Sequence, residues 1–247
     1  MKCIVLAAGY ATRLYPLTEN FPKPLLKVKE RAIIDWIIED LDQYGIISEF
    51  IIVSNHKYVG CFKEWQQSAN YNAKITVIDD GTVDNANRLG AVRDIAFAIE
   101  TCDIDEAVVV VAGDNLTDFS LKGFVDYFAT KNATCVMRHY EQDVNRLRKT
   151  GVITIDDSDL ILEMEEKPAE PKSNWAVPPF YAYRREDLSK IVKVAKENVC
   201  NLDAPGDFIS WLCENSKVYA YKMPGNRYDI GDLESYKRIQ DIYVGIK

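Results

Sequence analysis

The sequence predicts an α/β protein with a mostly parallel sheet covered by helices on both faces. One observation behind this is a set of short, β-branched, almost wholly apolar segments, the pattern of strands buried on both faces. Another is that amphipathic segments at helical spacing separate them. Such alternation produces right-handed βαβ units. Because 247 residues suffice for one large α/β domain, we expect a single domain over residues 1–247.

The first half contains the clearest strand and helix patterns. Strands are expected at residues 3–7, 50–54, 74–78 and 107–112. Between them, two apolar stripes predict helices: Ile34, Ile37, Ile38, Leu41 and Tyr44 form one, and Leu89, Val92, Ala96 and Ile99 form the other.

The second half has a different character. Residues 150–168 (TGVITIDDSDLILEMEEKP) hold a strand, an acidic turn and a second strand, which predicts a β-hairpin. Residues 173–184 predict another strand, in which Pro178 and Pro179 indicate a bend or an exposed edge. A helix is expected after residues 185–187, a strand over 217–223 and a last helix over 233–246.

Composition excludes several classes of protein. The net charge of -8 disfavours nucleic-acid binding, which requires a basic face. No apolar run is long enough to cross a bilayer, and the short N-terminal run does not have the pattern of a signal peptide. The six cysteines form no CxxC pair, which argues against a zinc site and a disulfide framework. We therefore expect a cytoplasmic protein without a membrane or nucleic-acid partner.

The N-terminal strand is followed by a loop with the features of a phosphate site. Backbone N–H groups after a strand can cradle phosphates, and Gly9 lets the chain come close to them. Arg13 and Lys23 can add charge-assisted hydrogen bonds to the same oxygens. On glycine and charge alone, an ordinary surface turn is the simpler interpretation. The loop contains neither a dinucleotide-binding nor a Walker sequence.

The whole string LAAGYATRLYPLTENFPKPLL (residues 6–26) resembles the signature of the sugar-phosphate nucleotidyltransferases, the NDP-sugar pyrophosphorylases. The resemblance implies a three-layer α/β/α Rossmann-like fold of the nucleotide-diphospho-sugar transferase type. It implies that an NTP and a sugar 1-phosphate yield an NDP-sugar and pyrophosphate. It also implies that Leu6, Ala8 and Gly9 bind the nucleotide, while Arg13 and Lys23 are catalytic residues that hold its phosphates.

A candidate metal site comes from two distant segments. VVVVAGDNL (residues 108–116) is a buried strand that ends in Gly-Asp, which places Asp114 where ligands bind in open α/β sheets. Alone, Asp114 could equally be a turn residue or a helix cap. NRYDIGDLESY (residues 226–236) resembles the family's late segment W-x-D-I/T-G-T-x-x-S/D-Y. That resemblance implies that Asp114 and Asp229 bind Mg²⁺. Asp232 instead predicts an N-cap, with Ser235 three residues later.

The hairpin region resembles the sugar-phosphate wall of the thymidylyl- and uridylyl-transferring members. The match implies that Gly151 contacts the sugar, Glu166 its hydroxyls and Lys167 its phosphate, as a catalytic residue. Asn174 and Ala176 would line the same pocket. A solvated, charged edge strand is the alternative interpretation of EEKP. Two prolines stand where the family usually has Thr-Gly, which leaves the shape of the pocket open.

The base-reading segment is the weakest part of the resemblance. Residues 77–95 keep Leu-Gly-Ala at 89–91, which implies a nucleotide contact at Gly90, but lack the family's glutamine or glutamate. Residues that could replace that contact are Asp79, Asp80, Asn85 and Arg88, and of these we assign Asp80 to the nucleotide. The segment has a faint likeness to the cytidylyl-transferring branch.

The expected partners are therefore an NTP and a phosphorylated small molecule. A cytidylyltransferase acting on a non-sugar phosphate such as phosphocholine is the alternative, and a related-fold glycosyltransferase ranks below it because GDN replaces the usual D-x-D. A regulatory paralogue without turnover ranks lower still. Because little sequence follows Asp229, we expect no appended acyltransferase or β-helix domain. The base, the sugar, allosteric regulation and the oligomeric state, a homo-oligomer included, stay open.

Overall fold

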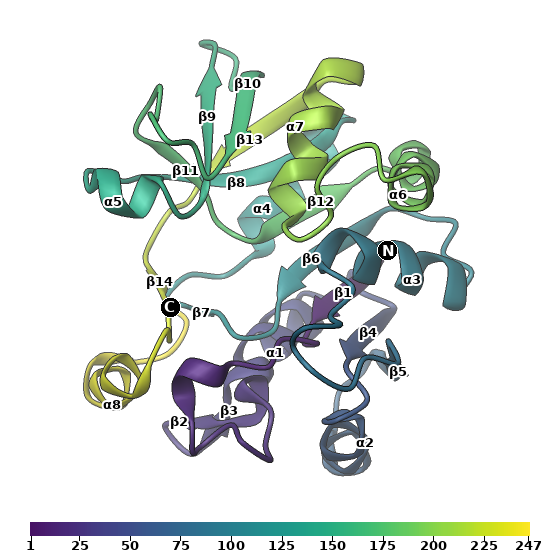
Figure 1. Ribbon diagram of the computed structural model, residues 1–247, viewed down its shortest axis with the longest axis vertical. Coiled ribbons are helices and arrows are strands. Elements are labelled where there is room, and N and C mark those ends of the chain that lie inside the picture. The colour runs from purple at the N-terminus through teal and green to yellow at the C-terminus, as the bar shows by residue number, and fades with distance from the viewer. The chain divides into compact units, whose positions relative to one another are not determined.

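The computed structural model describes residues 1–247, which form two compact units (Figure 1). The first unit comprises residues 1–88, 111–123 and 224–247, and the second comprises residues 89–110 and 124–223. Strand β6 (Val108–Ala112) begins in the second unit and ends in the first. The predicted α/β fold is confirmed.

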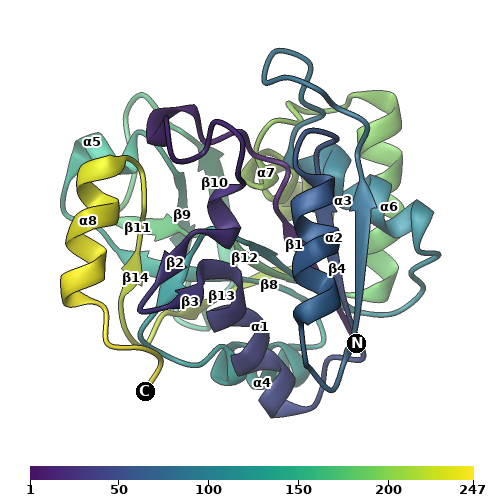
Figure 2. The same ribbon diagram turned by 90° about the horizontal axis from the view of Figure 1, so that it is seen from below.

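A parallel sheet forms the centre of the first unit. Strands β1 (Lys2–Leu6), β4 (Glu49–Ser54) and β5 (Lys74–Asp79) pair side by side in parallel, as three of the apolar segments predicted. Helix α1 (Ile33–Tyr44) connects β1 to β4, and α2 (Val59–Ser68) connects β4 to β5. Because both right-handed crossovers step in the same direction, the two helices lie on the same face of these strands (Figure 2).

Shorter elements complete the first unit. They are the 3-10 turns η1 (Thr12–Leu14) and η2 (Lys23–Leu25), the hairpin of β2 (Lys27–Val28) and β3 (Arg31–Ala32), the antiparallel pair β7 (Leu116–Thr117) and β14 (Arg227–Tyr228), and α8 (Leu233–Ile242). Asp232 caps α8 in a capping box with Ser235, as predicted. The helix ends at Ile242 rather than at 246, and Tyr243 packs edge-on against Trp36.

Antiparallel pairing predominates in the second unit. The predicted hairpin is confirmed as β9 (Gly151–Ile155) and β10 (Ile161–Glu166). Strand β11 (Trp175–Val177) joins β9 to β8 (Thr134–Tyr140), and β12 (Phe180–Tyr183) follows after the predicted break at the two prolines. Strand β13 (Val218–Lys222) pairs with β8 in parallel, so the strand directions are mixed.

Helices surround the strands of the second unit. They are α3 (Ala91–Thr101), the last part of α4 (Lys122–Lys131), the single turn α5 (Val144–Leu147), α6 (Arg185–Glu197) and α7 (Pro205–Asn215). Leu89 lies outside α3, because Gly90 adopts φ +92° and starts the helix. No helix in the chain combines the length and apolar character that crossing a membrane requires.

Candidate functional site

The phosphate loop, defined here as residues 8–23, follows β1 in the first unit. The Asn55 amide donates to the carbonyl of Ala8 at 2.8 Å, and the Thr18 hydroxyl donates to that of Ala11 at 2.8 Å. The Tyr58 hydroxyl in turn donates to the Thr18 carbonyl at 2.6 Å. Gly9 is exposed, and the space where its side chain would point is open. Side chains of the fold therefore hold the loop in place through its carbonyl groups, while its backbone at Gly9 stays accessible.

The two predicted phosphate-binding cations lie in different surroundings. The Arg13 guanidinium is exposed, and it contributes to lowering the pKa of the Asp232 carboxyl. The Lys23 side chain is only 8% exposed, and its Nζ donates to Asp114 Oδ2 at 2.6 Å. The structure thus joins Lys23 to one of the predicted metal ligands across 91 residues of sequence.

Asp114 lies two residues after the end of β6, as the apolar strand predicted. A side chain at Gly113 would lie 3.0 Å from the Val5 side chain, so the close approach of this segment to β1 favours glycine. Burial raises the pKa of the Asp114 carboxyl, but the positive charges of Lys23 and Arg227 outweigh it and hold that pKa below its usual range. Asp114 is therefore a carboxylate at neutral pH.

Asp229 is exposed and follows β14 directly. Antiparallel pairing of β14 with β7 sets Tyr228 opposite Leu116, which brings the segment carrying Asp229 beside the segment carrying Asp114. Asp118 fixes this arrangement by accepting hydrogen bonds from the backbone N–H and the side-chain amide of Asn226, at 2.7 and 2.9 Å. The two predicted ligand segments are thus neighbours.

The donor set fits Mg²⁺ held jointly by protein and substrate. No cluster of three or more Asp, Glu, His or Cys side chains converges in the chain, so the residues do not build a complete metal cage. Mg²⁺ sites in phosphate-handling proteins commonly use one or two carboxylates together with phosphate oxygens and water. Asp114 and Asp229 supply that number of hard oxygen donors, and Asp114 already faces an ammonium cation.

The predicted nucleotide contacts after β5 have structural partners of their own. Asp80 Oδ1 accepts from both the N–H and the hydroxyl of Thr82, while its buried Oδ2 has no hydrogen-bond partner. Burial raises the pKa of Asp80. In the second unit, a side chain at Gly90 would lie 2.5 Å from the Leu202 carbonyl, so Gly90 permits close packing at the start of α3. His56, isolated in sequence, lies 2.7 Å from Asp79.

Glu166 is the central group of the acceptor wall, defined here as β9, β10 and residues 167–174 of the second unit. Its side chain is 12% exposed, yet no hydrogen bond reaches its carboxylate; its nearest charged partner is Lys167, whose Nζ lies 3.9 Å away. Burial raises the pKa of Glu166 to about 7; Lys167 opposes this shift, and the Asp207 and Asp203 carboxylates add to it. A buried acceptor without donors is suited to receive hydrogen bonds from a ligand.

Glycines make room for that carboxylate. Glu166 pairs with Gly151 across the hairpin, and a side chain at Gly151 would lie 3.0 Å from Glu166 Oε2. A side chain at Gly206, in the first turn of α7, would lie only 2.0 Å from the same oxygen. The predicted sugar contact at Gly151 therefore coincides with space that Glu166 requires.

The other acceptor-wall residues differ in how free they are. The Lys167 side chain is half exposed on a backbone with φ +51°. The Asn174 amide donates to the Glu141 carbonyl at 2.8 Å, so its donor is already used in the fold. Ala176 is fully buried in a core cluster with Leu147 and Val152, so its side chain packs inside the unit rather than lining a pocket.

Sequence reasoning missed two further groups at these sites. In the first unit, Arg227 Nη1 donates to Asn115 Oδ1 at 2.6 Å, and Asn115 Nδ2 donates to Asp114 Oδ1 at 2.9 Å. In the second unit, Asp207 lies near Glu166, and its Oδ2 is buried without a hydrogen-bond partner. The position of Arg227, two residues before Asp229, was the only local signal for the first group. No local signal pointed to Asp207.

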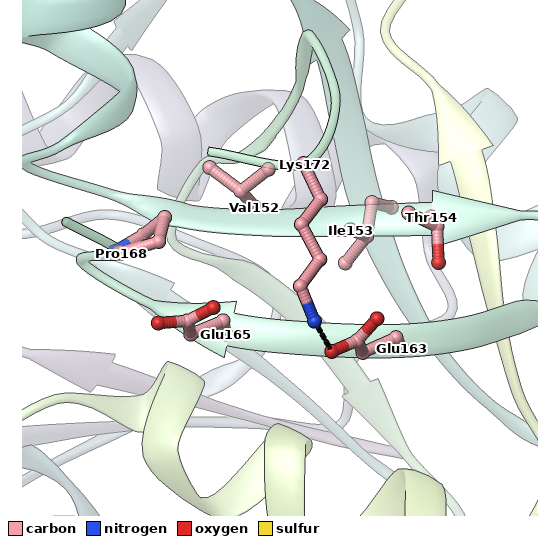
Figure 3. Close-up of a pocket in the computed structure, with 7 residues that line it drawn as sticks. All are labelled: Val152, Ile153, Thr154, Glu163, Glu165, Pro168 and Lys172. Atoms are coloured by element: carbon pink, nitrogen blue, oxygen red, sulfur yellow. Dashed lines mark hydrogen bonds and ion pairs between the residues drawn. The ribbon is translucent and has the colours of Figure 1, made fainter. Parts of the chain in front are cut away.

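A small hollow lies within the acceptor wall, but Gly151, Glu166, Lys167 and Asn174 do not line it. It is lined by Val152, Ile153, Thr154, Glu163, Glu165, Pro168 and Lys172. Figure 3 shows Lys172 extending across it from the β9 side to form an ion pair with Glu163. Its room of about 10 Å³ suits little more than one water molecule. It is therefore not a substrate pocket.

Comparison with known proteins gives both a family and a fold. The sequence model of the "Nucleotidyl transferase" family matches residues 2–244. A glucose-1-phosphate adenylyltransferase of Fervidobacterium nodosum is 26% identical over 94% of this chain, and the bifunctional protein GlmU of Methanocaldococcus jannaschii is 29% identical over 98%. The chain spans only 59% and 55% of the lengths of these two relatives.

Solved structures support the same fold. A UDP-glucose pyrophosphorylase complexed with UDP-glucose aligns with a TM-score of 0.82 at 21% identity, covering 98% of this chain and 97% of that one. A UDP-glucose pyrophosphorylase from Acinetobacter baumanii aligns with a TM-score of 0.80 at 18% identity, covering 97% and 91%. With the family sequence model matching nearly the whole chain, the protein belongs to the nucleotidyl transferase family.

Proposed function

We propose that this chain transfers a nucleotidyl group from an NTP to a sugar 1-phosphate, which yields an NDP-sugar and pyrophosphate. The observation that carries the proposal is the buried ammonium of Lys23, 2.6 Å from Asp114, at the end of a rigid loop whose backbone is open at Gly9. Such an arrangement offers cations and N–H groups to phosphates and carboxylates to a metal. Relatives in the family are named for glucose-1-phosphate adenylyl transfer, which supports this reaction class.

In the first unit, binding and charge neutralisation are the proposed tasks. The Lys23 ammonium has three donors and uses one on Asp114, so two remain for phosphate oxygens. Arg13 holds the β- and γ-phosphates, which leave as pyrophosphate. Asp114 and Asp229 hold Mg²⁺, which when bound neutralises phosphate charge. No side chain has to act as a nucleophile, because the attacking acceptor phosphate is already anionic at neutral pH.

In the second unit, acceptor recognition is the proposed task. Glu166 accepts hydrogen bonds from sugar hydroxyls, which would satisfy a carboxylate that otherwise has no donors. Lys167 supplies a point charge to the acceptor phosphate. The acceptor oxygen then attacks the α-phosphorus in line, and catalysis consists of positioning and electrostatic stabilisation.

A second candidate is cytidylyl transfer to a non-sugar phosphate such as phosphocholine. The acidic surroundings of Glu166 favour it, because the charges of Asp203 and Asp207 add to the rise in the pKa of that carboxyl. A cationic acceptor would reduce the repulsion between these three carboxylates. The two candidates share the same metal and triphosphate residues. They differ only in the acceptor.

A pyrophosphate-release assay tests the proposal. Purified protein is incubated with Mg²⁺, each of the common NTPs and a panel of sugar 1-phosphates, with phosphocholine and phosphoethanolamine as further acceptors. Release that requires both an NTP and a sugar 1-phosphate supports the proposal. Release with an NTP and phosphocholine, but with no sugar 1-phosphate, favours the second candidate. No release with any pair of NTP and acceptor refutes both.

We further propose that residues 1–247 act as a single catalytic domain in the cytoplasm. The net charge of -8 supports small phosphorylated substrates rather than nucleic acid as partners. Gel filtration at several protein concentrations would establish the oligomeric state.

A further inference from the structure

A chain of hydrogen bonds in the first unit ends on the Asp114 carboxylate from both sides. Lys23 Nζ donates to Oδ2 at 2.6 Å, and Asn115 Nδ2 donates to Oδ1 at 2.9 Å. Arg227 Nη1 donates to Asn115 Oδ1 at 2.6 Å. The guanidinium therefore reaches the carboxylate through one buried amide, that of Asn115, which is 112 residues from Arg227 in the sequence.

The chemistry of arginine fixes the direction of this relay. A guanidinium can only donate hydrogen bonds, so the oxygen of the Asn115 amide has to face Arg227. The NH₂ group of the same amide then faces Asp114, where it can only donate. Asn115 is 3% exposed, so water does not compete for either end. The Ala112 carbonyl also accepts from Asn115 Nδ2, at 3.4 Å, and favours the same orientation. Without Arg227, the amide oxygen loses its charged donor, and the amide is held less firmly against Asp114.

Arg227 also lies on the segment that carries the other predicted ligand. It pairs with Thr117 across the β7 and β14 ladder, and Asp229 follows two residues later. The family pattern quoted above has tryptophan at this position, which has one neutral N–H donor and no positive charge. Arg227 thus bonds through its side chain to the residue next to Asp114 and lies two residues before Asp229 in the chain.

We propose that Arg227 is a positioning residue, which rests on the proposed function. Through Asn115 it holds the Asp114 carboxylate in the orientation that receives the divalent cation, and through β14 it keeps Asp229 beside it. Partners that orient metal ligands typically change metal affinity 10–100-fold when they are removed. A purely structural tether of β14 would change stability without that effect.

The test compares three full-length variants with the wild type. Arg227→Met keeps an unbranched apolar stem but has no donor, and Arg227→Lys retains the positive charge and N–H donors without the guanidinium fork. Arg238→Met is the matched control, because Arg238 is an exposed arginine on α8 in the same unit. Binding of Mn²⁺ alone is measured from the loss of the free-ion electron paramagnetic resonance signal, and thermal unfolding is recorded for every variant.

We expect Arg227→Met to weaken Mn²⁺ binding ~10–100-fold, Arg227→Lys to recover part of the loss and Arg238→Met to match the wild type. Unchanged Mn²⁺ affinity in folded Arg227→Met overturns the proposal, as does a wild type that binds no Mn²⁺ even at millimolar concentration. If the wild type binds Mn²⁺ in an Arg227-dependent way but releases no pyrophosphate, the proposed function fails and this inference stands. If it releases pyrophosphate but its Mn²⁺ binding does not depend on Arg227, the proposed function stands and this inference fails.

Discussion

The two side chains of the Lys23–Asp114 ion pair differ in exposure. Removing one or the other should therefore lower the free energy of unfolding by different amounts. The Lys23 side chain is 8% exposed, whereas that of Asp114 is 38% exposed. Lys23→Met leaves a carboxylate that water can reach. Asp114→Asn leaves an ammonium buried without a counter-charge, which is the more expensive defect.

The expected magnitudes follow from that difference. Hydrogen bonds to charged groups contribute roughly 1.5–3 kcal/mol, and leaving a buried charge unpaired costs the desolvation penalty in addition. Methionine fills the volume of the lysine stem and Asp114 regains hydration, so Lys23→Met should lower the free energy of unfolding by about 1 kcal/mol. Asp114→Asn should lower it by about 2–3 kcal/mol, below the ~3–5 kcal/mol of a fully buried pair.

Urea unfolding of both single variants and the double variant measures these free energies, with Arg238→Met as the control. A larger loss for Lys23→Met than for Asp114→Asn would refute the reasoning. In the pyrophosphate assay, both variants should lose ~10²–10³ in rate, because each removes a charged group from the same site. A folded Asp114→Asn with near-normal turnover in Mg²⁺ would contradict the metal assignment.

Further predictions concern the acceptor wall and the phosphate loop. Because the pKa of Glu166 is raised to about 7 in the folded state, above its ordinary value, stability should fall as pH rises from about 4.5 to 7; Glu166→Gln should remove that slope, of up to about 3 kcal/mol, in urea unfolding at several pH values. Lys167→Ala should raise KM for the acceptor more than for the NTP, and equal effects in steady-state kinetics would count against its role. Gly206→Ala places a methyl group 2.0 Å from Glu166 Oε2, so it should raise acceptor KM about tenfold while thermal unfolding changes little, since a flexible side-chain end can move; an unchanged KM would contradict this. Ala11 adopts φ +46°, so Ala11→Gly should raise the free energy of unfolding by up to about 1 kcal/mol, and a destabilised variant would contradict the strain.

Local patterns predicted much of the fold. Apolar runs of five or six residues identified β1, β4 and β6, because strands buried on both faces have little polar sequence. The same logic placed Asp114 at the end of β6. Strand β5 was also found, but the expectation that it is buried on both faces was wrong, because it is the edge strand and mostly half-buried. The break between β11 and β12 followed from two consecutive prolines, since proline cannot donate to a strand ladder.

Features that depend on distant residues could not be predicted. The EEKP sequence suggests an exposed edge, yet Glu165 is exposed and Glu166 is largely buried, because Gly206 from α7 leaves space for its carboxylate. The relay from Arg227 to Asp114 depends on a hydrogen bond between Arg227 and Asn115, which are 112 residues apart, and no short motif encodes it. Backbone strain at Ala11 is likewise invisible in a sequence, since alanine is compatible with most local conformations.

The most direct test of the account follows one oxygen atom through the reaction. A sugar 1-phosphate labelled with ¹⁸O in its phosphate is incubated with the protein, Mg²⁺ and the active NTP, and the products are analysed by mass spectrometry. Attack by the acceptor phosphate on the α-phosphorus predicts that all label appears in the NDP-sugar and none in pyrophosphate. Label in the released pyrophosphate, or the absence of any labelled nucleotide product, would contradict it.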